Sequence, residues 1–490
     1  MSGGRKVRFI EPQGRRGRPF NAWVGRWPLL GPIILASILK QKGYDVAVYN
    51  ENILGRVLEN PAYLSDLADC DVVCLTIMTP TACRGYQIAG RLRQVNPKAV
   101  IAIGGVHASF MPQEAIQYAD IVCRGEGEGV IEAIARGDIT RGIVEPGPVE
   151  DLDSVARPDF GVMVGFDRLV NRLGRRRYEL PMMTSRGCPY GCTYCSVSRM
   201  FGRKVRRQSL DRIFGDVEHY SSQGFRHLMF YDDNFAADRQ FTRLLLERVA
   251  PLRLKFNAQV RADFVWKNQA RDDLDQPLLE AMRQGGADVL YVGFETIDDR
   301  TARQWHKGYS DGGSLRDQLR EDTQIFHDNG FWVHGMFVLG PQHEHRDARG
   351  IVDFARETRM ESLQVSILTP LPGTPVYAQM RPHLVLDDYP ADWDYYDGAH
   401  CVYDHGRLGL EELTKTLIRL HARFYGGWGM SLRRLLTTLR KDSSLRENLR
   451  TLYLQAKTSR RILKLWQQET RSFIELVRRR LADRVPQLGA

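Results

Sequence analysis

The chain has 490 residues, of which 43% are hydrophobic and 10% aromatic, so it is long enough for two or three globular domains. No run of 18 apolar residues occurs and the start, MSGGRKVRFIEP, has no apolar signal-peptide core, which argues against a membrane-spanning or secreted protein. Its net charge of +10 equals the excess within residues 431–490, where fifteen Lys and Arg face five Asp and Glu. The 8 unevenly placed cysteines argue against a disulfide framework, and we expect a cytoplasmic protein.

The first 140 residues alternate short β-branched segments with helical ones. The strand-like segments are KVRFIEP, YDVAVYN, DVVCLTIM, AVIAIGG and DIVCRGEGE. This alternation predicts an α/β domain, a doubly wound, Rossmann-like parallel sheet over residues 1–140. Ligands of such sheets bind beyond the carboxyl ends of the strands. The residues expected there are Thr76, Gly104, Gly105, His107, Gly125 and Glu126.

Residues 141–175 are punctuated by Pro, Gly and Asp and indicate a linker. A second alternating series follows, with six strand-like segments separated by helical ones. They are LPMMTSRG, HLMFYDDN, LKFNAQVR, DVLYVGFET, WVHGMFVLG and SLQVSILTP. Six such units over residues 176–385 predict a partial (β/α)6 TIM-like barrel, whose chemistry lies at the C-terminal strand ends.

Residues 386–490 are expected to form a helical, basic C-terminal region, because apolar residues recur there at three- and four-residue spacing. Three interpretations stay open for its charge. The helices cap the barrel, or they lie on a membrane surface, since Leu, Trp and Phe opposite Arg is the interfacial pattern. Nucleic-acid binding is the least favoured, because no known motif is present.

The stretch RGCPYGCTYC places Cys188, Cys192 and Cys195 at C-x3-C-x2-C spacing after the first barrel strand. Three thiolates on one loop can hold an iron–sulfur cluster and leave one iron open. Zinc is the alternative, but it requires a fourth ligand, and the nearest downstream histidine is His219. An inert group of thiols is the third interpretation.

CPYGCTYC resembles the signature of the radical S-adenosylmethionine (SAM) enzymes, including the aromatic Tyr194 before the last cysteine. The resemblance implies that the three cysteines ligate a [4Fe-4S] cluster, and that the amino and carboxylate groups of SAM chelate the fourth iron. Reductive cleavage of SAM then gives a 5′-deoxyadenosyl radical. The residues that the resemblance places near SAM are Asp232, Asp233, Asn234, Asn257, Arg261 and Glu295.

A doubly wound domain ahead of such a barrel is similar to the cobalamin-binding subgroup of this superfamily. PLLGPIILASILKQKGYDVAVYNEN and IGGVHASFMPQEAIQYADIVCRGEGE carry that likeness, although the D-x-H-x-x-G motif of some cobalamin proteins is absent. By this resemblance, the residues expected at the strand ends from Thr76 to Glu126 line a cobalamin groove. Methylthiotransferases pair similar domains but hold a second cluster. Here Cys74, Cys83 and Cys123 fall within strands or a helix, which favours core positions.

The resemblance implies C-methylation of an unactivated carbon in a hydrophobic lipid, isoprenoid or tetrapyrrole-like substrate. The alternatives are oxidative cyclisation or hydroxylation of a tetrapyrrole-like substrate, methylthiolation, and a metal-loaded binding protein without catalysis. The expected partners are the small hydrophobic substrate and a flavodoxin- or ferredoxin-like electron donor. The basic C-terminal helices add a peripheral contact with the membrane surface, and nucleic acid is not expected.

Overall fold

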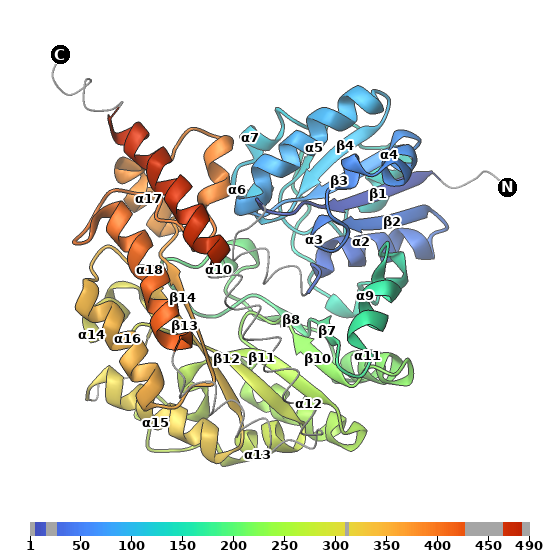
Figure 1. The fold of residues 1–490 in the computed structure, drawn as a ribbon. Helices are drawn as coiled ribbons and strands as arrows, with labels where there is room; N and C mark the ends of the chain where they lie inside the picture. The colour runs from blue at the N-terminus through green and yellow to red at the C-terminus, as the bar shows by residue number, and fades with distance from the viewer. Residues whose placement is uncertain (1–4, 16–26, 309–312, 427–463, 483–490) are drawn as a thin grey trace.

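The computed structural model of the chain describes residues 5–15, 27–308, 313–426 and 464–482. These residues form two six-stranded parallel sheets flanked by helices, and a two-stranded hairpin lies between them (Figure 1). The hairpin consists of β8 (Ser185–Arg186) and β9 (Arg206–Arg207). The α/β class, with a parallel sheet followed by a barrel-like sheet, is therefore confirmed.

The first sheet has the strand order β2-β1-β3-β4-β5-β6, and every neighbouring pair is parallel. Its strands are β1 (Lys6–Glu11), β2 (Asp45–Asn50), β3 (Val72–Thr76), β4 (Val100–Gly104), β5 (Ile121–Cys123) and β6 (Gly142–Val144). The direction of winding reverses between β1 and β3, which opens a ligand crevice at their carboxyl ends. The short edge strand β6 was not predicted, because three residues leave little pattern to detect.

Helices join the strands of this sheet and bury apolar stripes against it. They are α2 (Leu30–Gln41), α3 (Glu51–Leu54), α4 (Pro61–Ala68), α5 (Ala82–Val95), α6 (Val106–Phe110), α7 (Pro112–Ala115) and α8 (Ile131–Arg136). In α2, for example, Ile33, Ala36 and Leu39 are fully buried, at the three-residue spacing of one helix face. The predicted linker contains α9 (Phe166–Leu173).

The second sheet has the sequential order β14-β13-β12-β11-β10-β7, again all parallel, as an open barrel requires. The strands are β7 (Glu179–Met182), β10 (His227–Phe230), β11 (Lys255–Arg261), β12 (Ala287–Glu295), β13 (Trp332–Leu339) and β14 (Ser362–Ile367). The helices are α10 (Val197–Met200), α11 (Leu210–Ser222), α12 (Arg239–Val249), α13 (Gln276–Gln284), α14 (Asp299–Gln304), α15 (Leu315–Asp328), α16 (His345–Glu357) and α17 (Pro375–Met380). All six predicted barrel strands are present.

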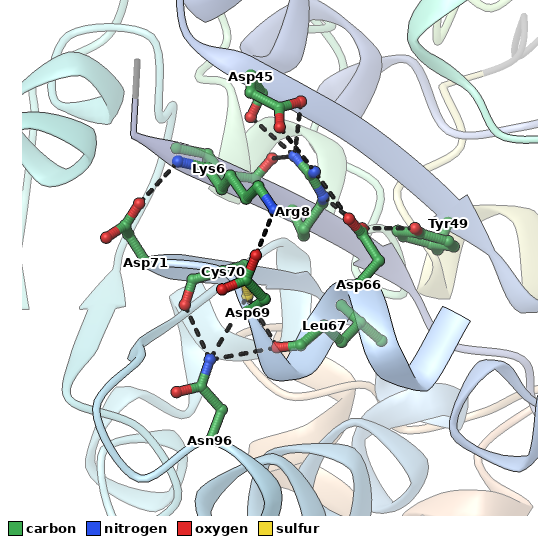
Figure 2. Close-up of polar contacts among 11 residues, drawn as sticks. Lys6, Arg8, Asp45, Tyr49, Asp66, Leu67, Asp69, Cys70, Asp71 and Asn96 are labelled. Atoms are coloured by element: carbon green, nitrogen blue, oxygen red, sulfur yellow. Dashed lines mark hydrogen bonds and ion pairs between the residues drawn. The ribbon is translucent and has the colours of Figure 1, made fainter. Parts of the chain in front are cut away.

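An ion-pair network around the buried Arg8 fastens the amino ends of the first sheet (Figure 2). Arg8, on β1, bonds to Asp45 on β2 and to Asp66 on α4. The thiol of Cys70 donates to the carbonyl of Leu67 in the same region. This network lies at the end of the sheet opposite the ligand crevice, so its role is to hold β1, β2 and α4 together.

The C-terminal region contains α18 (Gly409–Tyr425) and a further helical stretch at 464–482, drawn in red in Figure 1. The rest of the basic tail, 427–463 and 483–490, lies outside the described residues. Residues 464–482 bury Trp466, Phe473 and Val477 against the protein, as the cap interpretation predicts. Among the described residues, none of the helices combines the length and apolar character needed to cross a bilayer.

Candidate functional site

The three cysteines lie on the long loop that the β8–β9 hairpin closes, at the carboxyl edge of the barrel. The loop turns sharply at Gly187, whose φ is +95° and where a Cβ would lie 2.6 Å from the carbonyl of Lys204. The amide of Cys188 donates to the carbonyl of Gly202, and that of Thr193 donates to Trp305. Glycine and backbone bonds to the flanking segments therefore fix the path of this loop.

The three thiols of this loop are free and only partly exposed. Burial raises the pKa of Cys188, and it raises that of Cys195 to about 12, so metal binding would have to displace their protons. In the part of the chain that is described, no three His, Cys, Asp or Glu side chains converge where one ion could bind. A four-iron cluster places each thiolate on a different iron, so three cysteines on one loop can supply its protein ligands.

Three acidic or amide residues follow β10 at the same edge. Asp232 is buried and accepts hydrogen bonds from Thr184 and Ser185, so its carboxylate fixes the start of the cysteine loop. Burial and the charge of Asp232 raise the pKa of Asp233 to about 7. Asn234 has a buried Oδ1 for which the described residues provide no donor. A cation beside Asp233 would stabilise its ionised form, and a donor beside Asn234 would satisfy this oxygen.

Arg261, at the end of β11, lies over the ring of Tyr190 with 3.8 Å from Cζ to the ring centroid. It also forms a bidentate ion pair with Asp263. Arg261 therefore supports the cysteine loop through Tyr190, a residue that the sequence analysis missed. An isolated tyrosine inside a cysteine motif gives no signal of its own.

Glu295 ends β12 in the left-handed region, at φ +65°, where the pairing with β13 shifts register. Its carboxylate bonds to Lys307, which is 4% exposed, at 3.3 Å. A Cβ at Gly293 would lie 2.8 Å from Glu295 Oε1, so glycine leaves room for this pair. Lys307 was also missed, because it follows α14 and no motif marks it.

Asn257 is not placed with these residues. It sits at the third position of β11, and its Oδ1 accepts hydrogen bonds from His227 Nε2 and from the Val289 amide. Those partners lie at the amino ends of β10 and β12, opposite the cysteine loop. The structure therefore places Asn257 as a buried polar link near the amino ends of the strands, apart from the other SAM candidates; the pattern alone could not say how deep in the strand it lies.

The carboxyl edge of the first sheet lines a cavity of about 340 Å³. Five of the predicted groove residues lie on its wall: Thr76, Gly104, Gly105, Gly125 and Glu126. A Cβ at Gly105, where φ is +96°, would lie 2.6 Å from the carbonyl of Ile77. The cavity extends between the strands and the apolar faces of α2 and α8, and its volume lies within the range of small-molecule sites. The glycines and this apolar slot suit part of a large cofactor such as cobalamin.

His107 does not line that cavity. Its ring is fully buried, bonded to Thr79 and Glu114, and it meets the edge of Trp393 with 4.9 Å between ring centroids. Trp393 Nε1 in turn donates to Glu114 at 2.9 Å. His107 therefore forms part of a packed junction between the first sheet and the segment that follows the barrel, away from the cavity wall.

The cysteines of the first domain do not form a ligand loop. Cys74 lies in β3 and Cys83 in α5, both buried, and Cys123 ends β5. Burial raises the pKa of Cys74, and that of Cys123 to about 11, which keeps both as neutral thiols. Cys74 and Cys123 also lie on the cavity wall, whereas Cys83 is packed within α5, and among the described residues no three such side chains come together where one ion could bind.

Barrel residues close the cavity from the other side. They are Met183, Arg186, Met200, Phe201 and Tyr231, and they lie on or near the cysteine loop or at the end of β10. Tyr231 also meets Trp27 edge to face, and Trp27 meets Tyr291 on β12. Aromatic side chains thus connect the cavity with the interior face of the barrel.

Comparisons with known proteins match both units. A family model described as a B12 binding domain matches residues 22–135, and one described as the radical SAM superfamily matches residues 182–355. Bacteriochlorophyllide d C-12(1)-methyltransferase of Chlorobaculum tepidum is 25% identical over 86% of this chain and 88% of that protein. Hopanoid C-3 methylase of Methylococcus capsulatus is 24% identical over 81% of this chain and 77% of that protein.

A third relative is named for a different reaction. Anaerobic magnesium-protoporphyrin IX monomethyl ester cyclase of Rubrivivax gelatinosus is 23% identical over 86% of this chain and 77% of that protein. Among solved structures, the enzyme OxsB with aqua-cobalamin and SAM bound aligns with a TM-score of 0.62, 14% identity and coverage of 99% of this chain and 81% of that one. The methyltransferase TsrM of Kitasatospora setae, with cobalamin and a [4Fe-4S] cluster bound, aligns with a TM-score of 0.59, 16% identity and coverage of 77% and 75%. At these low identities, the two structural similarities show a similar fold and nothing about the reaction.

Proposed function

We propose that this chain, a radical SAM enzyme with an N-terminal B12-binding domain, transfers a methyl group to an unactivated carbon of a hydrophobic substrate. The observation that carries the proposal is the position of the cavity. It lies at the carboxyl edge of the first sheet, and residues on or beside the cysteine loop form its opposite wall. A carbon radical attacks what is nearest, so a methyl donor must be held within reach of the radical site.

The cofactors of these domains are a [4Fe-4S] cluster, SAM and cobalamin. When bound, the cluster and SAM supply a 5′-deoxyadenosyl radical, and cobalamin supplies the methyl group. We assign the cluster to Cys188, Cys192 and Cys195. We assign the SAM ammonium group to Asp233 and Asn234, because one has a raised pKa and the other an unsatisfied buried oxygen.

The other edge residues position these ligands. Asp232 fixes the start of the loop through Thr184 and Ser185. Arg261 supports the loop by packing on the ring of Tyr190. Glu295 and Lys307 form a charged pair at the next strand end. These side chains are held by packing and ion pairs, so they keep their arrangement before a ligand arrives.

The surface that leads from the cobalamin cavity into the barrel supports a hydrophobic substrate. Its barrel wall offers Met183, Met200, Phe201 and Tyr231, and Trp27 and Tyr291 continue the aromatic surface inward. Flat apolar groups pack well on such rings. The relatives that act on bacteriochlorophyllides and hopanoids, by their names, make these two classes the first substrates to test.

The test is anaerobic reconstitution with iron, sulfide and hydroxocobalamin, followed by incubation with methyl-labelled SAM and a low-potential reductant. Bacteriochlorophyllide d, magnesium-protoporphyrin IX monomethyl ester and a hopanoid are supplied separately. We expect 5′-deoxyadenosine, S-adenosylhomocysteine and one labelled product. Deoxyadenosine without S-adenosylhomocysteine would instead indicate the cyclase-type oxidation that one relative is named for. Purified protein that binds zinc and no iron would overturn the proposal.

The electron donor is expected at the exposed side of the cysteine loop. Pro189, Tyr190 and Gly191 are exposed there, and Arg203 and Lys204 on the same loop are also exposed. A basic surface of this kind suits an acidic flavodoxin- or ferredoxin-like protein. Replacing Lys204, an exposed side chain that pairs with the equally exposed Glu150, with Glu should slow turnover with flavodoxin and leave turnover with a small chemical reductant unchanged.

A further inference from the structure

Four charged side chains meet between the cavity and the cysteine loop. Glu126, from the segment after β5, bonds to both Arg186 and Arg206, with 2.7 Å between Glu126 Oε2 and Arg186 Nη1. Arg186 also bonds to Glu128 at 2.6 Å. Two carboxylates and two guanidinium groups give the cluster no net charge, so it can be buried without leaving an unpaired ion.

The burial of this cluster is nearly complete. The side chains of Glu126 and Arg206 are each 4% exposed, and that of Arg186 is 6% exposed. Burial opposes ionisation of Glu126, but the hydrogen bond from Arg206 and the charge of Arg186 hold its pKa below its ordinary value. Glu126 Oε2 also accepts a bond from the Val149 amide, so this one carboxylate joins the hairpin to the segment after β6.

These four charged side chains lie where the cysteine loop meets the cavity. Arg186 and Arg206 face each other as a pair in the β8–β9 hairpin, which is the base of the loop carrying Cys188, Cys192 and Cys195. Glu126 and Arg186 also form part of the cavity wall. One carboxylate from the first domain thus holds the base of the cysteine loop and faces the space where cobalamin is proposed to bind.

We infer that Glu126 is a positioning residue that couples the cavity to the cysteine loop, so that cobalamin and the iron–sulfur cluster bind cooperatively. This inference rests on the proposed function, because it needs both cofactors. An occupant of the cavity restrains Glu126, Glu126 restrains Arg186 and Arg206, and these fix the loop that holds the cluster. Coupling of this kind is reciprocal: each cofactor raises affinity for the other by the same factor.

The test measures the dissociation constant of hydroxocobalamin by anaerobic equilibrium dialysis, with and without the reconstituted cluster. For the unaltered protein we expect binding about tenfold tighter when the cluster is present, within the usual range of coupling. For Glu126→Gln we expect the ratio of the two constants to fall to about 1. Iron content and the electron paramagnetic resonance spectrum of the reduced cluster show that the variant still forms it.

The matched control is Glu150→Gln. Glu150 pairs with Lys204 on the same loop, but both side chains are exposed, so the same change of charge should leave the ratio unchanged. A residue with only a structural role would weaken both constants equally and preserve the ratio. A ratio near 1 in the unaltered protein, or a tenfold ratio in Glu126→Gln, would overturn the inference.

A second variant keeps the inference testable if Glu126→Gln does not fold. The double variant Glu126→Gln with Arg206→Gln removes one charge of each sign. The remaining pair of charged side chains, Glu128 and Arg186, then has no net charge. This double variant should fold and should also show a ratio near 1. Failure of the unaltered protein to bind either cofactor would contradict the proposed function itself, whereas independent binding of both would contradict only the coupling.

Discussion

The carboxyl edges of the two sheets carry different kinds of residue. The edge of the first sheet presents glycines and apolar side chains around a cavity, with Gly105 and Gly125 at positive φ. The edge of the barrel presents three thiols, the carboxylates of Asp233 and Glu295, and the cations Arg261 and Lys307. One edge selects its ligand by shape and the other by charge and coordination, although both occupy the same position in a parallel sheet.

The difference shows how one chain can serve two cofactors. An apolar slot binds through contact area, so backbone conformation decides its function. A coordinating edge binds through a few polar atoms, so individual side chains decide. Substitutions at the two edges should therefore fail in different ways.

The largest effect is expected for Cys192→Ala at the barrel edge. With two thiolates left, the cluster should not assemble, and iron content and deoxyadenosine should fall to background while hydroxocobalamin still binds. Iron analysis and chromatography measure both. Cys401→Ala is the control, since Cys401 is buried and donates to the Tyr403 carbonyl far along the chain. Equal iron loss in the control would show that the loss reflects general unfolding.

The second prediction concerns Glu11, an acidic residue at the otherwise glycine-rich and apolar edge of the first sheet. Glu11 ends β1, and burial raises its pKa to about 8. It then stays protonated in the folded chain while it ionises near pH 4.5 in the unfolded one, so stability falls as pH rises from about 4.5 to 8. The loss is up to about 4 kcal/mol. The free energy of unfolding measured in urea should be lower at pH 8 than at pH 5. Glu11→Gln should reduce this difference by the part that Glu11 contributes. An unchanged difference would contradict the assignment.

The third prediction tests selection by shape. Gly105→Val places a Cβ against the Ile77 carbonyl at a positive φ, which should cost about 2 kcal/mol and close the cavity edge. Hydroxocobalamin binding should be lost while the cysteine loop still assembles its cluster. Gly90→Ala serves as control, because that helical position has open space around it and should gain stability slightly. Retained cobalamin affinity in Gly105→Val would refute the shape argument.

The smallest expected effect is at Asn234. Removing its unsatisfied oxygen in Asn234→Ala should weaken SAM binding about tenfold without destabilising the free protein. Asn257→Ala is the converse control. It lies deep in the same barrel, so it should leave SAM affinity unchanged but destabilise the fold by removing the acceptor for His227 and the Val289 amide. Calorimetric titration of SAM and thermal unfolding separate the two outcomes.

Much of the fold followed from local pattern. The predicted strands up to SLQVSILTP all formed, because β-branched runs bounded by turn residues are local signals. The cysteine loop was equally local, since spacing and turn residues lie within ten positions. The edge strand β6 was too short for any pattern, and the proposed domain boundaries and cofactor contacts stay predictions.

The sequence by itself determined the two alternating series, the three-thiol loop and the strand ends where ligands bind. Only the tertiary structure decided that Asn257 lies deep in the barrel and that His107 is packed against Trp393. It alone paired Glu126 with Arg186 and Arg206, across sequence separations of 60 and 80 residues. Strand periodicity tells which face a side chain takes, but partners and depth depend on how two sheets pack, and no local pattern encodes that.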